Sequence, residues 1–225
     1  MRTIAILIGT FLPCALLSQV TGDYTGTLRA MDKESSSTTI GNPYVFEDFL
    51  NGYIYFSDKT RSTERMINYN CYDNEVLYLD GENMYLLDVA LIDSLEFRMD
   101  ENTSLIFRKV ELDGNGRPVF LNILYDGESA LYKRYYKEFR ESDAGKAYGG
   151  GQRYDEYIDR SDYYISLGGE DIQPLSPRKN AVLKMMGASA EEMESFLKNE
   201  KINLKSDDDL VRMMGYYDSL ATRSQ

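Results

Sequence analysis

The stretch from residue 91 to residue 99 reads LIDSLEFRM, and its alternation of apolar and polar residues is the clearest structural signal in the chain. One side of an extended chain would carry Leu91, Asp93, Leu95, Phe97 and Met99, of which only Asp93 is polar. The other side would carry Ser94, Glu96 and Arg98. A period of two is that of a β-strand with one buried and one wet face. We therefore predict a strand at 91–99 in an antiparallel sheet.

Segments of similar character lie on both sides of this stretch, between Pro43 and about Phe139. They are Tyr53–Phe56, Met66–Cys71, Val76–Leu79, Met84–Leu87, Leu105–Val110, Val119–Tyr125 and Leu131–Phe139. The dipeptides between them are typical of tight hairpins: Asn51-Gly52, Asp80-Gly81, Asp113-Gly114, Asn115-Gly116 and Asp126-Gly127. We predict an α+β protein, mainly an antiparallel β meander at 41–140 that closes as a sandwich or a small barrel.

The pattern changes after residue 140. Residues 141–162 contain Gly149-Gly150-Gly151 and many charges, which predicts a loop or linker. A last strand is expected at Tyr163–Leu167, within a C-terminal part that covers 163–225. Short helices should follow there, with predicted starts at Ser176-Pro177, at Ser189 with Glu192, and at Ser206 with Asp209.

The N-terminus predicts export. Met1-Arg2 is followed by fourteen mostly apolar residues, Ile4–Leu17, and then by Ser18 and Gln19. This is the pattern of a secretory signal peptide at 1–18, and the run is shorter than the roughly 20 residues that span a bilayer. Cleavage before Gln19 is favoured over lipidation at Cys14, because Pro13 is a poor residue before a lipidated cysteine. Residues 19–40 are polar and predict a flexible leader.

Composition excludes several function classes. The net charge of the 225 residues is −12, which disfavours binding to nucleic acid or to anionic lipid. The chain has no histidine, so Ser-His-Asp and Cys-His systems and the usual catalytic zinc sites are excluded. Cys71 has no basic neighbour in sequence and is expected to be a buried small hydrophobe rather than a reactive thiol. We expect no catalytic residue set, no metal site and no cofactor.

Tyrosine is abundant, with nineteen residues and no tryptophan. In one cluster Tyr132, Tyr135 and Tyr136 alternate with Lys133, Arg134 and Lys137. In the other, Tyr148, Tyr154 and Tyr157 lie in the glycine-rich loop, and Tyr163 and Tyr164 lie at its exit. Most tyrosines suit half-buried strand positions, but exposed ones supply rigid contact area in binding surfaces. Tyr132, Tyr135, Tyr136, Tyr148, Tyr154 and Tyr157 are the candidate binding residues.

The chain resembles an uncharacterised family of exported hypothetical proteins from Bacteroidota-type bacteria. The resemblance lies in Gly41–Phe49, in Asn68-Tyr69-Asn70, in Asp126-Gly127 leading to Leu131–Tyr135, and in the helical tail from Ser176 to Leu220. It implies export, to the periplasm or the cell surface, and it implies no particular activity.

Three functional hypotheses follow from these observations. The leading one is a non-enzymatic module that binds another envelope protein, because the residue types of common catalytic sites are missing and tyrosine is plentiful. The second is a carboxylate-dependent glycan hydrolase, which requires a cleft that holds two carboxylates, one of them desolvated. The third is a carrier of a small apolar ligand, which requires a sizeable interior cavity.

Overall fold

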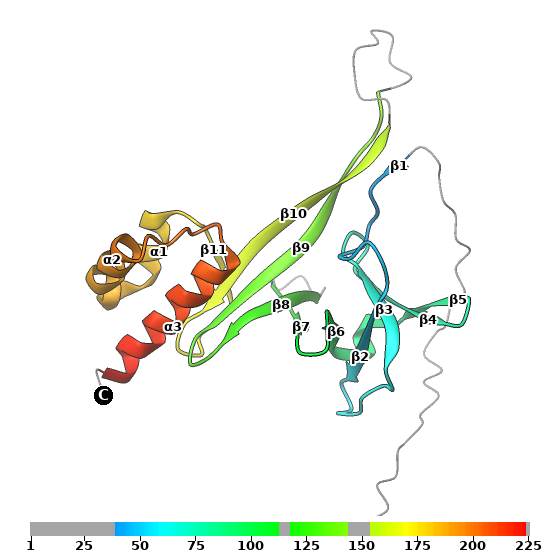
Figure 1. The fold of residues 1–225 in the computed structure, drawn as a ribbon, viewed down its shortest axis with the longest axis horizontal. Coiled ribbons are helices and arrows are strands. Elements are labelled where there is room, and N and C mark those ends of the chain that lie inside the picture. Colours follow the sequence, from blue (N-terminus) through cyan, green and yellow to red (C-terminus); the bar gives the residue numbers. More distant parts are fainter. Residues whose placement is uncertain (1–38, 113–117, 144–153, 224–225) are drawn as a thin grey trace, which may run out of the picture.

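The computed structural model describes residues 39–112, 118–143 and 154–223, and Figure 1 shows their arrangement. This part of the chain forms one sheet of eleven strands, with helices gathered at one end. The strands are β1 (Thr39–Ile40), β2 (Leu50–Phe56), β3 (Arg65–Asn70), β4 (Glu75–Asp80), β5 (Asn83–Leu87), β6 (Ile92–Arg98), β7 (Ser104–Val110), β8 (Val119–Asp126), β9 (Ala130–Arg140), β10 (Asp155–Ser166) and β11 (Gln173–Leu175).

The predicted mainly antiparallel sheet is confirmed, but the meander is interrupted once, because β6 pairs with β2 and not with β5. The order is β1-β10-β9-β8-β7-β6-β2-β3-β4-β5, and β11 also pairs with β10. All pairs are antiparallel except β1 with β10. Closure into a sandwich or a small barrel, however, was wrongly predicted. The sheet stays open because the strands at its two ends do not pair with each other. β5 lies at one end, whereas β10, near the other end, pairs with β1 and β11.

Each part of the sheet has its own core. The first core lies among β2 to β8 and contains three fully buried rings, Phe97, Phe107 and Phe120. The second lies between the helices and the ends of β9, β10 and β11, around Leu131 and Ile165. β8 contributes buried residues to more than one apolar cluster, because its successive residues Phe120 and Leu121 point to opposite faces of the sheet. The long strands β9 and β10 connect the two parts (Figure 1).

The predicted strand at 91–99 corresponds to β6, with a corrected set of buried residues. Leu95 and Phe97 are buried as expected, but Leu91 and Met99 are exposed and Ile92 is buried. The reason is a β-bulge: Tyr55 of β2 pairs with Ser94, whereas Phe56 pairs with Ile92, so Asp93 is the extra residue. The bulge shifts the alternation by one residue. This explains why Asp93 interrupts the apolar pattern.

The prediction of a loop at 141–162 also needs a correction. β10 begins at Asp155, not at Tyr163, and residues 156–166 pair with β9 over eleven consecutive positions. In its middle, residues 159–162 are all exposed, so both faces of this part of β10 meet water. Such a strand has no apolar face, so its sequence resembles that of a loop.

The leader expected at 19–40 also needs a correction at its end. Thr39 and Ile40 form β1, which pairs in parallel with Asp155 and Glu156 of β10. Residues 1–38, which include the expected signal peptide and most of the leader, lie outside the described residues.

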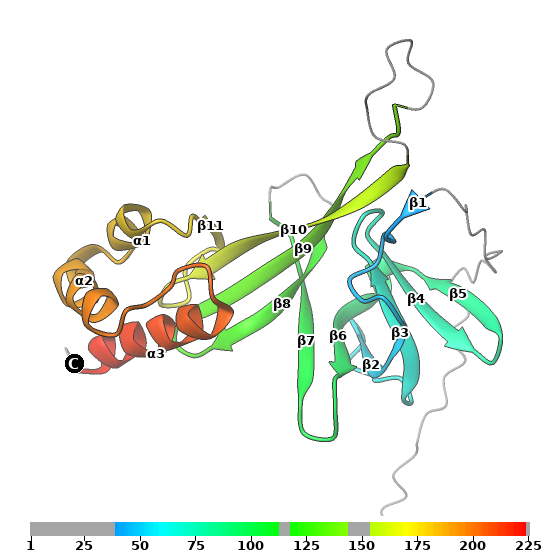
Figure 2. The same ribbon diagram turned by 45° about the horizontal axis from the view of Figure 1, so that its top comes forward.

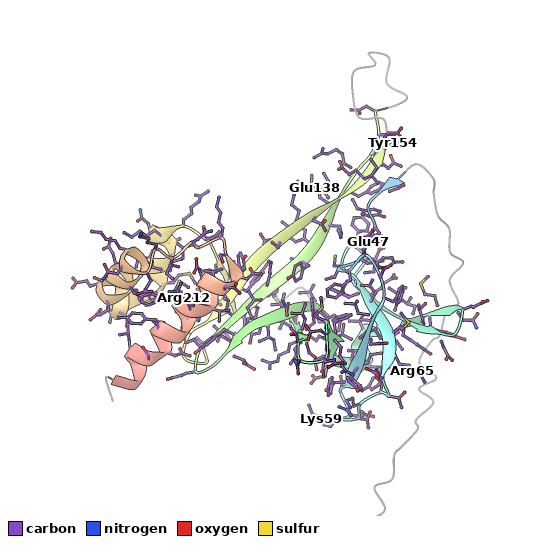
Figure 3. The ribbon with its side chains drawn as sticks, in the orientation of Figure 1. Glu47, Lys59, Arg65, Glu138, Tyr154 and Arg212 are labelled. Atoms are coloured by element: carbon purple, nitrogen blue, oxygen red, sulfur yellow. The ribbon has the colours of Figure 1, made fainter. Side chains whose placement is uncertain are left out.

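The predicted C-terminal helices are confirmed as α1 (Lys179–Met185), α2 (Ala190–Asn199) and α3 (Asp207–Arg223). The described residues also form the short 3-10 turns η1 (Val89–Leu91), before β6, and η2 (Gly187–Ser189), between α1 and α2. Ser206 caps α3, accepting a hydrogen bond from the Asp209 N–H at 3.5 Å. The start expected at Ser176-Pro177 is wrong, because α1 begins at Lys179 without a side-chain cap. In Figure 3, Arg212 of α3 extends toward α2, where it forms an ion pair with Glu200 at 2.8 Å.

Among the described residues, no helix combines the length and the apolar character needed to cross a membrane.

Candidate binding surface

Three aromatic rings contact one another where the far end of the β9–β10 ribbon passes the turn between β3 and β4, and Tyr44 lies near enough to affect the pKa of Tyr157. We call Tyr44, Tyr72, Phe139 and Tyr157 the aromatic surface. The ring centroid of Tyr157 lies 4.9 Å from that of Phe139 and 5.3 Å from that of Tyr72. Tyr72 and Phe139 are 6.2 Å apart. These tilted and edge-to-face arrangements are the ones that aromatic pairs prefer.

Tyr72 owes its position to the turn that it belongs to. The Asn70 side-chain oxygen accepts hydrogen bonds from the backbone N–H groups of Tyr72 and Asp73, at 3.1 and 3.0 Å. The same amide donates to the Asp73 carboxylate at 2.9 Å. Asparagine commonly closes turns in this way. The turn therefore holds the Tyr72 ring outward, and the residue is 45% exposed.

Tyr157 is held by close packing of the chain over its backbone. Gly41 directly follows β1 and has a φ of +77°, a backbone conformation in which a residue with a side chain would be strained. A Cβ atom at Gly41 would also lie 3.0 Å from the carbonyl oxygen of Tyr157. Glycine at position 41 thus lets β1 and the segment after it lie against β10 beside the aromatic surface.

Acidic groups give this surface its electrostatic character. Burial raises the pKa of Tyr44, and the carboxylates of Glu75 and Asp73 raise it further. Burial likewise raises the pKa of Tyr157, with Asp73, Tyr72 and Tyr44 adding to the effect. Both phenols are therefore neutral near pH 7 and can donate hydrogen bonds. The surface combines apolar ring area, hydroxyl donors and negative charge.

The candidate residues of the first tyrosine cluster are dispersed by the geometry of β9. Tyr132 is only 5% exposed, in a small apolar cluster with Leu121 and Ala130. Tyr135 packs on the first core, 5.9 Å from Phe107. Tyr136 lies on the opposite face, with the Arg134 guanidinium 5.5 Å from its ring centroid. Tyr132, Tyr135 and Tyr136 thus share no single surface.

The lysines of that cluster are engaged in ion pairs. Lys133 forms an ion pair with Asp207 at 2.7 Å, and Lys137 forms one with Asp159 at 2.5 Å. The basic segment in the sequence is therefore not a basic patch on the protein.

The second cluster is only partly described. Tyr157 belongs to the aromatic surface, whereas Tyr154 is 49% exposed just before β10, as Figure 3 shows at the end of the ribbon. Tyr148 lies outside the described residues. Tyr44, Tyr72 and Phe139 were missed as site residues, because they are distant from Tyr157 in sequence and only the fold brings them together.

The carboxylates of Asp218 and Asp207 accept hydrogen bonds from groups on the sheet, and both have structural roles. Asp218 of α3 accepts hydrogen bonds from the Ser129 N–H at 3.0 Å and from the Tyr125 hydroxyl at 3.0 Å. Asp207 accepts from Lys133 and from the Tyr163 hydroxyl at 2.5 Å. Both residues hold α3 against the sheet. Within the described ranges, no three His, Cys, Asp or Glu side chains gather closely enough to hold a metal ion.

A shallow hollow of about 470 Å³ lies beside β11 and is lined by Gly169, Glu170, Asp171 and Gln173. Its lining contains no apolar side chain of the kind that a carrier of an apolar ligand requires.

Cys71, next to the aromatic surface, is a buried thiol as expected, with 8% exposure. Burial raises its pKa to about 11, which keeps the sulfur protonated and unreactive near pH 7.

We compared the chain with family models, with curated proteins and with solved structures, and none of the three comparisons gave a match.

Proposed function

We propose that this protein is an exported, non-enzymatic binding module of the cell envelope, and that the aromatic surface contacts its protein partner. The observation that carries the proposal is the exposed Tyr72 ring, packed against Tyr157 and Phe139. These rings come from three separate parts of the chain.

The geometry of these rings favours contact over a purely internal role. Interface residues that dominate binding are enriched in tyrosine, because a tyrosine ring supplies a large contact area with little loss of side-chain entropy. The ring of Tyr72 is held by its two aromatic neighbours before any partner arrives, which further reduces the ordering cost of binding.

Charge indicates the character of the partner. Asp73 and Glu75 lie near the aromatic surface, and the whole chain carries a net charge of −12. A partner that presents lysine or arginine side chains beside an apolar contact would be attracted by this field, and arginine also stacks on tyrosine rings.

Site-specific photo-crosslinking in living cells of the native host tests the proposal. Tyr72 is replaced by p-benzoylphenylalanine in the full-length tagged chain, and irradiated cells are analysed by gel electrophoresis and mass spectrometry. Ile106 is the matched control position, because it is equally exposed, at 45%, and lies on the strand β7 rather than in the β3–β4 turn. We expect a discrete adduct with one envelope protein from position 72 and none with it from position 106.

The adduct should also disappear when Tyr157 is changed to serine in the crosslinking chain, because the aromatic side chain at position 72 loses the neighbouring ring that holds it. A chain that migrates alone at both positions, or equal adducts from 72 and 106, would contradict the proposal.

A further inference from the structure

Among the residues that the structure describes, β5 ends the sheet, and its hydrogen-bonding groups can be assigned from the pairing with β4. Asp80 and Asn83 pair across the two-residue turn Gly81-Glu82, and Gly81 has φ +61°, as a type II′ turn requires at its first central position. The pair that flanks such a turn is hydrogen-bonded, and pairs then alternate along the ladder. Met84 and Leu86 therefore direct their N–H and C=O groups away from β4, toward the open edge.

This edge lacks the features that usually protect an edge strand. Asn83–Leu87 reads NMYLL and contains no charge and no proline. Met84, Tyr85 and Leu86 are all partly exposed. The hairpin of β4 and β5 also projects from the rest of the sheet, as Figure 2 shows.

The outer side of β10 is different. Between its short pairings with β1 and β11, its exposed residues are Asp159, Arg160, Ser161 and Asp162. Three charges in four residues disfavour addition of a further strand there. Of the two stretches, only the β5 edge has the chemistry of a strand acceptor.

Charges around β5 identify the kind of strand that fits. Glu82 and Asp88, which flank the strand, are both exposed. The nearby Arg65 lies 3.7 Å from Asp80, in an ion pair. In a two-fold pairing of β5 with a second copy, centred on Tyr85, Glu82 would lie opposite Asp88 of that copy at both ends. Like charges in directly opposite positions are destabilising.

We propose that the β5 edge binds an extended segment of another protein by β-strand addition, and that this segment has alternating apolar residues with lysine or arginine at its ends. Main-chain hydrogen bonds at Met84 and Leu86 give affinity, and the basic ends meet Glu82 and Asp88. This surface is separate from the aromatic surface and does not depend on the function proposed for it.

The first test uses a fluorescein-labelled heptapeptide in which valine and threonine alternate between terminal lysines, titrated with the purified full-length chain. We expect saturable binding by fluorescence anisotropy. A peptide with the same sequence but N-methylated at alternate amides should bind at least about tenfold more weakly, because it loses main-chain hydrogen bonds. A peptide with terminal glutamates should also bind more weakly, and added salt should reduce that difference.

Two variants at one position separate main-chain from side-chain recognition. Leu86→Pro removes an outward N–H but no hydrogen bond to β4, since proline is tolerated where the N–H of an edge strand faces solvent. Leu86→Ala shortens the side chain and keeps the N–H. We expect Leu86→Pro to weaken binding of the lysine-ended peptide about tenfold or more, and Leu86→Ala to weaken it about threefold or less.

Several outcomes would overturn the proposal. They are equal affinities for the methylated and unmethylated peptides, the absence of saturable binding, and a stable dimer in sedimentation experiments that Leu86→Pro dissociates. The last result would show that a second copy occupies the edge. The peptide measurements stay decisive if Leu86→Pro fails to fold, because they leave the protein unchanged. Their failure would also leave the crosslinking result at Tyr72 unaffected.

Discussion

Asn68 shows how single polar residues shape this protein. Its side chain is fully buried in β3, where the amide nitrogen donates to the carbonyl oxygens of Phe46 and Asp48, at 2.9 and 3.1 Å. The segment before β2 is thereby held over the sheet, and the Phe46 ring reaches 4.8 Å from Phe97 in the first core. A buried amide whose hydrogen bonds are satisfied fixes the path of an irregular segment, which an apolar residue cannot do.

Cys71 gives a prediction at the residue scale. We expect Cys71 to react with a maleimide about 100-fold or more slowly in the folded protein than in denaturant, because labelling requires local opening of the structure. Burial leaves 8% of the residue exposed and raises the pKa of the thiol to about 11. The measurement uses a Cys14→Ser chain, in which Cys71 is the remaining cysteine. Equal rates in the two states would show that the thiol is accessible.

At the scale of single elements, glycine positions mark where strands approach most closely. Gly52 lies in β2 between β3 and β6, and a Cβ atom there would lie 2.1 Å from the backbone oxygen of Glu96. Gly215 lies inside α3, where an added Cβ would meet an ordinary contact at 3.9 Å, to Tyr125. The same substitution should therefore have opposite effects in the two elements.

We predict that Gly52→Ala lowers the free energy of unfolding by roughly 2 kcal/mol or more, because the clash is with backbone that cannot move cheaply. Gly215→Ala should raise the free energy of unfolding by about 0.5–1 kcal/mol, because alanine is the better helix former. Chemical denaturation of the two variants beside the unchanged chain measures both effects. Equal stabilities of the two variants would contradict the assigned β2–β6 packing.

The β9–β10 ribbon shows why an element can escape detection in the sequence. Its central cross-strand contacts are ion pairs, Lys137 with Asp159 at 2.5 Å and Arg160 with Glu138 at 2.8 Å. In Figure 3, Glu138 lies toward the far end of the ribbon, away from the helices. Charged residues on both faces produce no apolar alternation, so only the pairing partner reveals the strand.

At the scale of the whole molecule, two cores share one sheet and are separated by polar residues. Asn122 of β8 and Lys133 of β9 pair across the strands between the cores. Lys133 and the Tyr163 hydroxyl both donate hydrogen bonds to Asp207 at the start of α3. This group of three, which we call the α3 junction, holds the helical part against the ribbon.

The α3 junction predicts a pH dependence of stability. Burial, and then the hydrogen bond to Asp207, raise the pKa of Tyr163 from its ordinary value of 10 to about 12. Because the folded-state pKa is above the unfolded one, the stabilisation is complete below pH 10 and is lost as the pH rises through 12. We expect the melting temperature to fall steeply over this window.

Tyr163→Phe should make that fall shallower, because the variant has no phenol to ionise at the α3 junction. Tyr154→Phe, at an exposed position, is the matched control and should keep the slope of the unchanged chain. Thermal melts at pH 8, 10 and 11.5 compare the three proteins. Identical slopes for Tyr163→Phe and the unchanged chain would remove Tyr163 from the junction.

The sequence by itself determined the mainly antiparallel sheet and the C-terminal helices. Local patterns were sufficient there, because a strand such as Met84–Leu87 or a cap such as Ser206 is decided by neighbouring residues. The same patterns predicted a buried Cys71. They could not show that the candidate tyrosines of β9 share no single surface, since successive residues of β9 point to opposite faces and Tyr132 is interior.

Only the tertiary structure decided which aromatic residues meet and whether the sheet closes. Tyr72 and Tyr157 are eighty-five positions apart, and their contact depends on how the ribbon passes the β3–β4 turn. Whether the sheet closes likewise depends on which strands lie at its two ends. β5 lies at one end because the next strand along the chain, β6, pairs with β2 and not with β5. Pairings between distant segments depend on the whole chain, and no local pattern contains them.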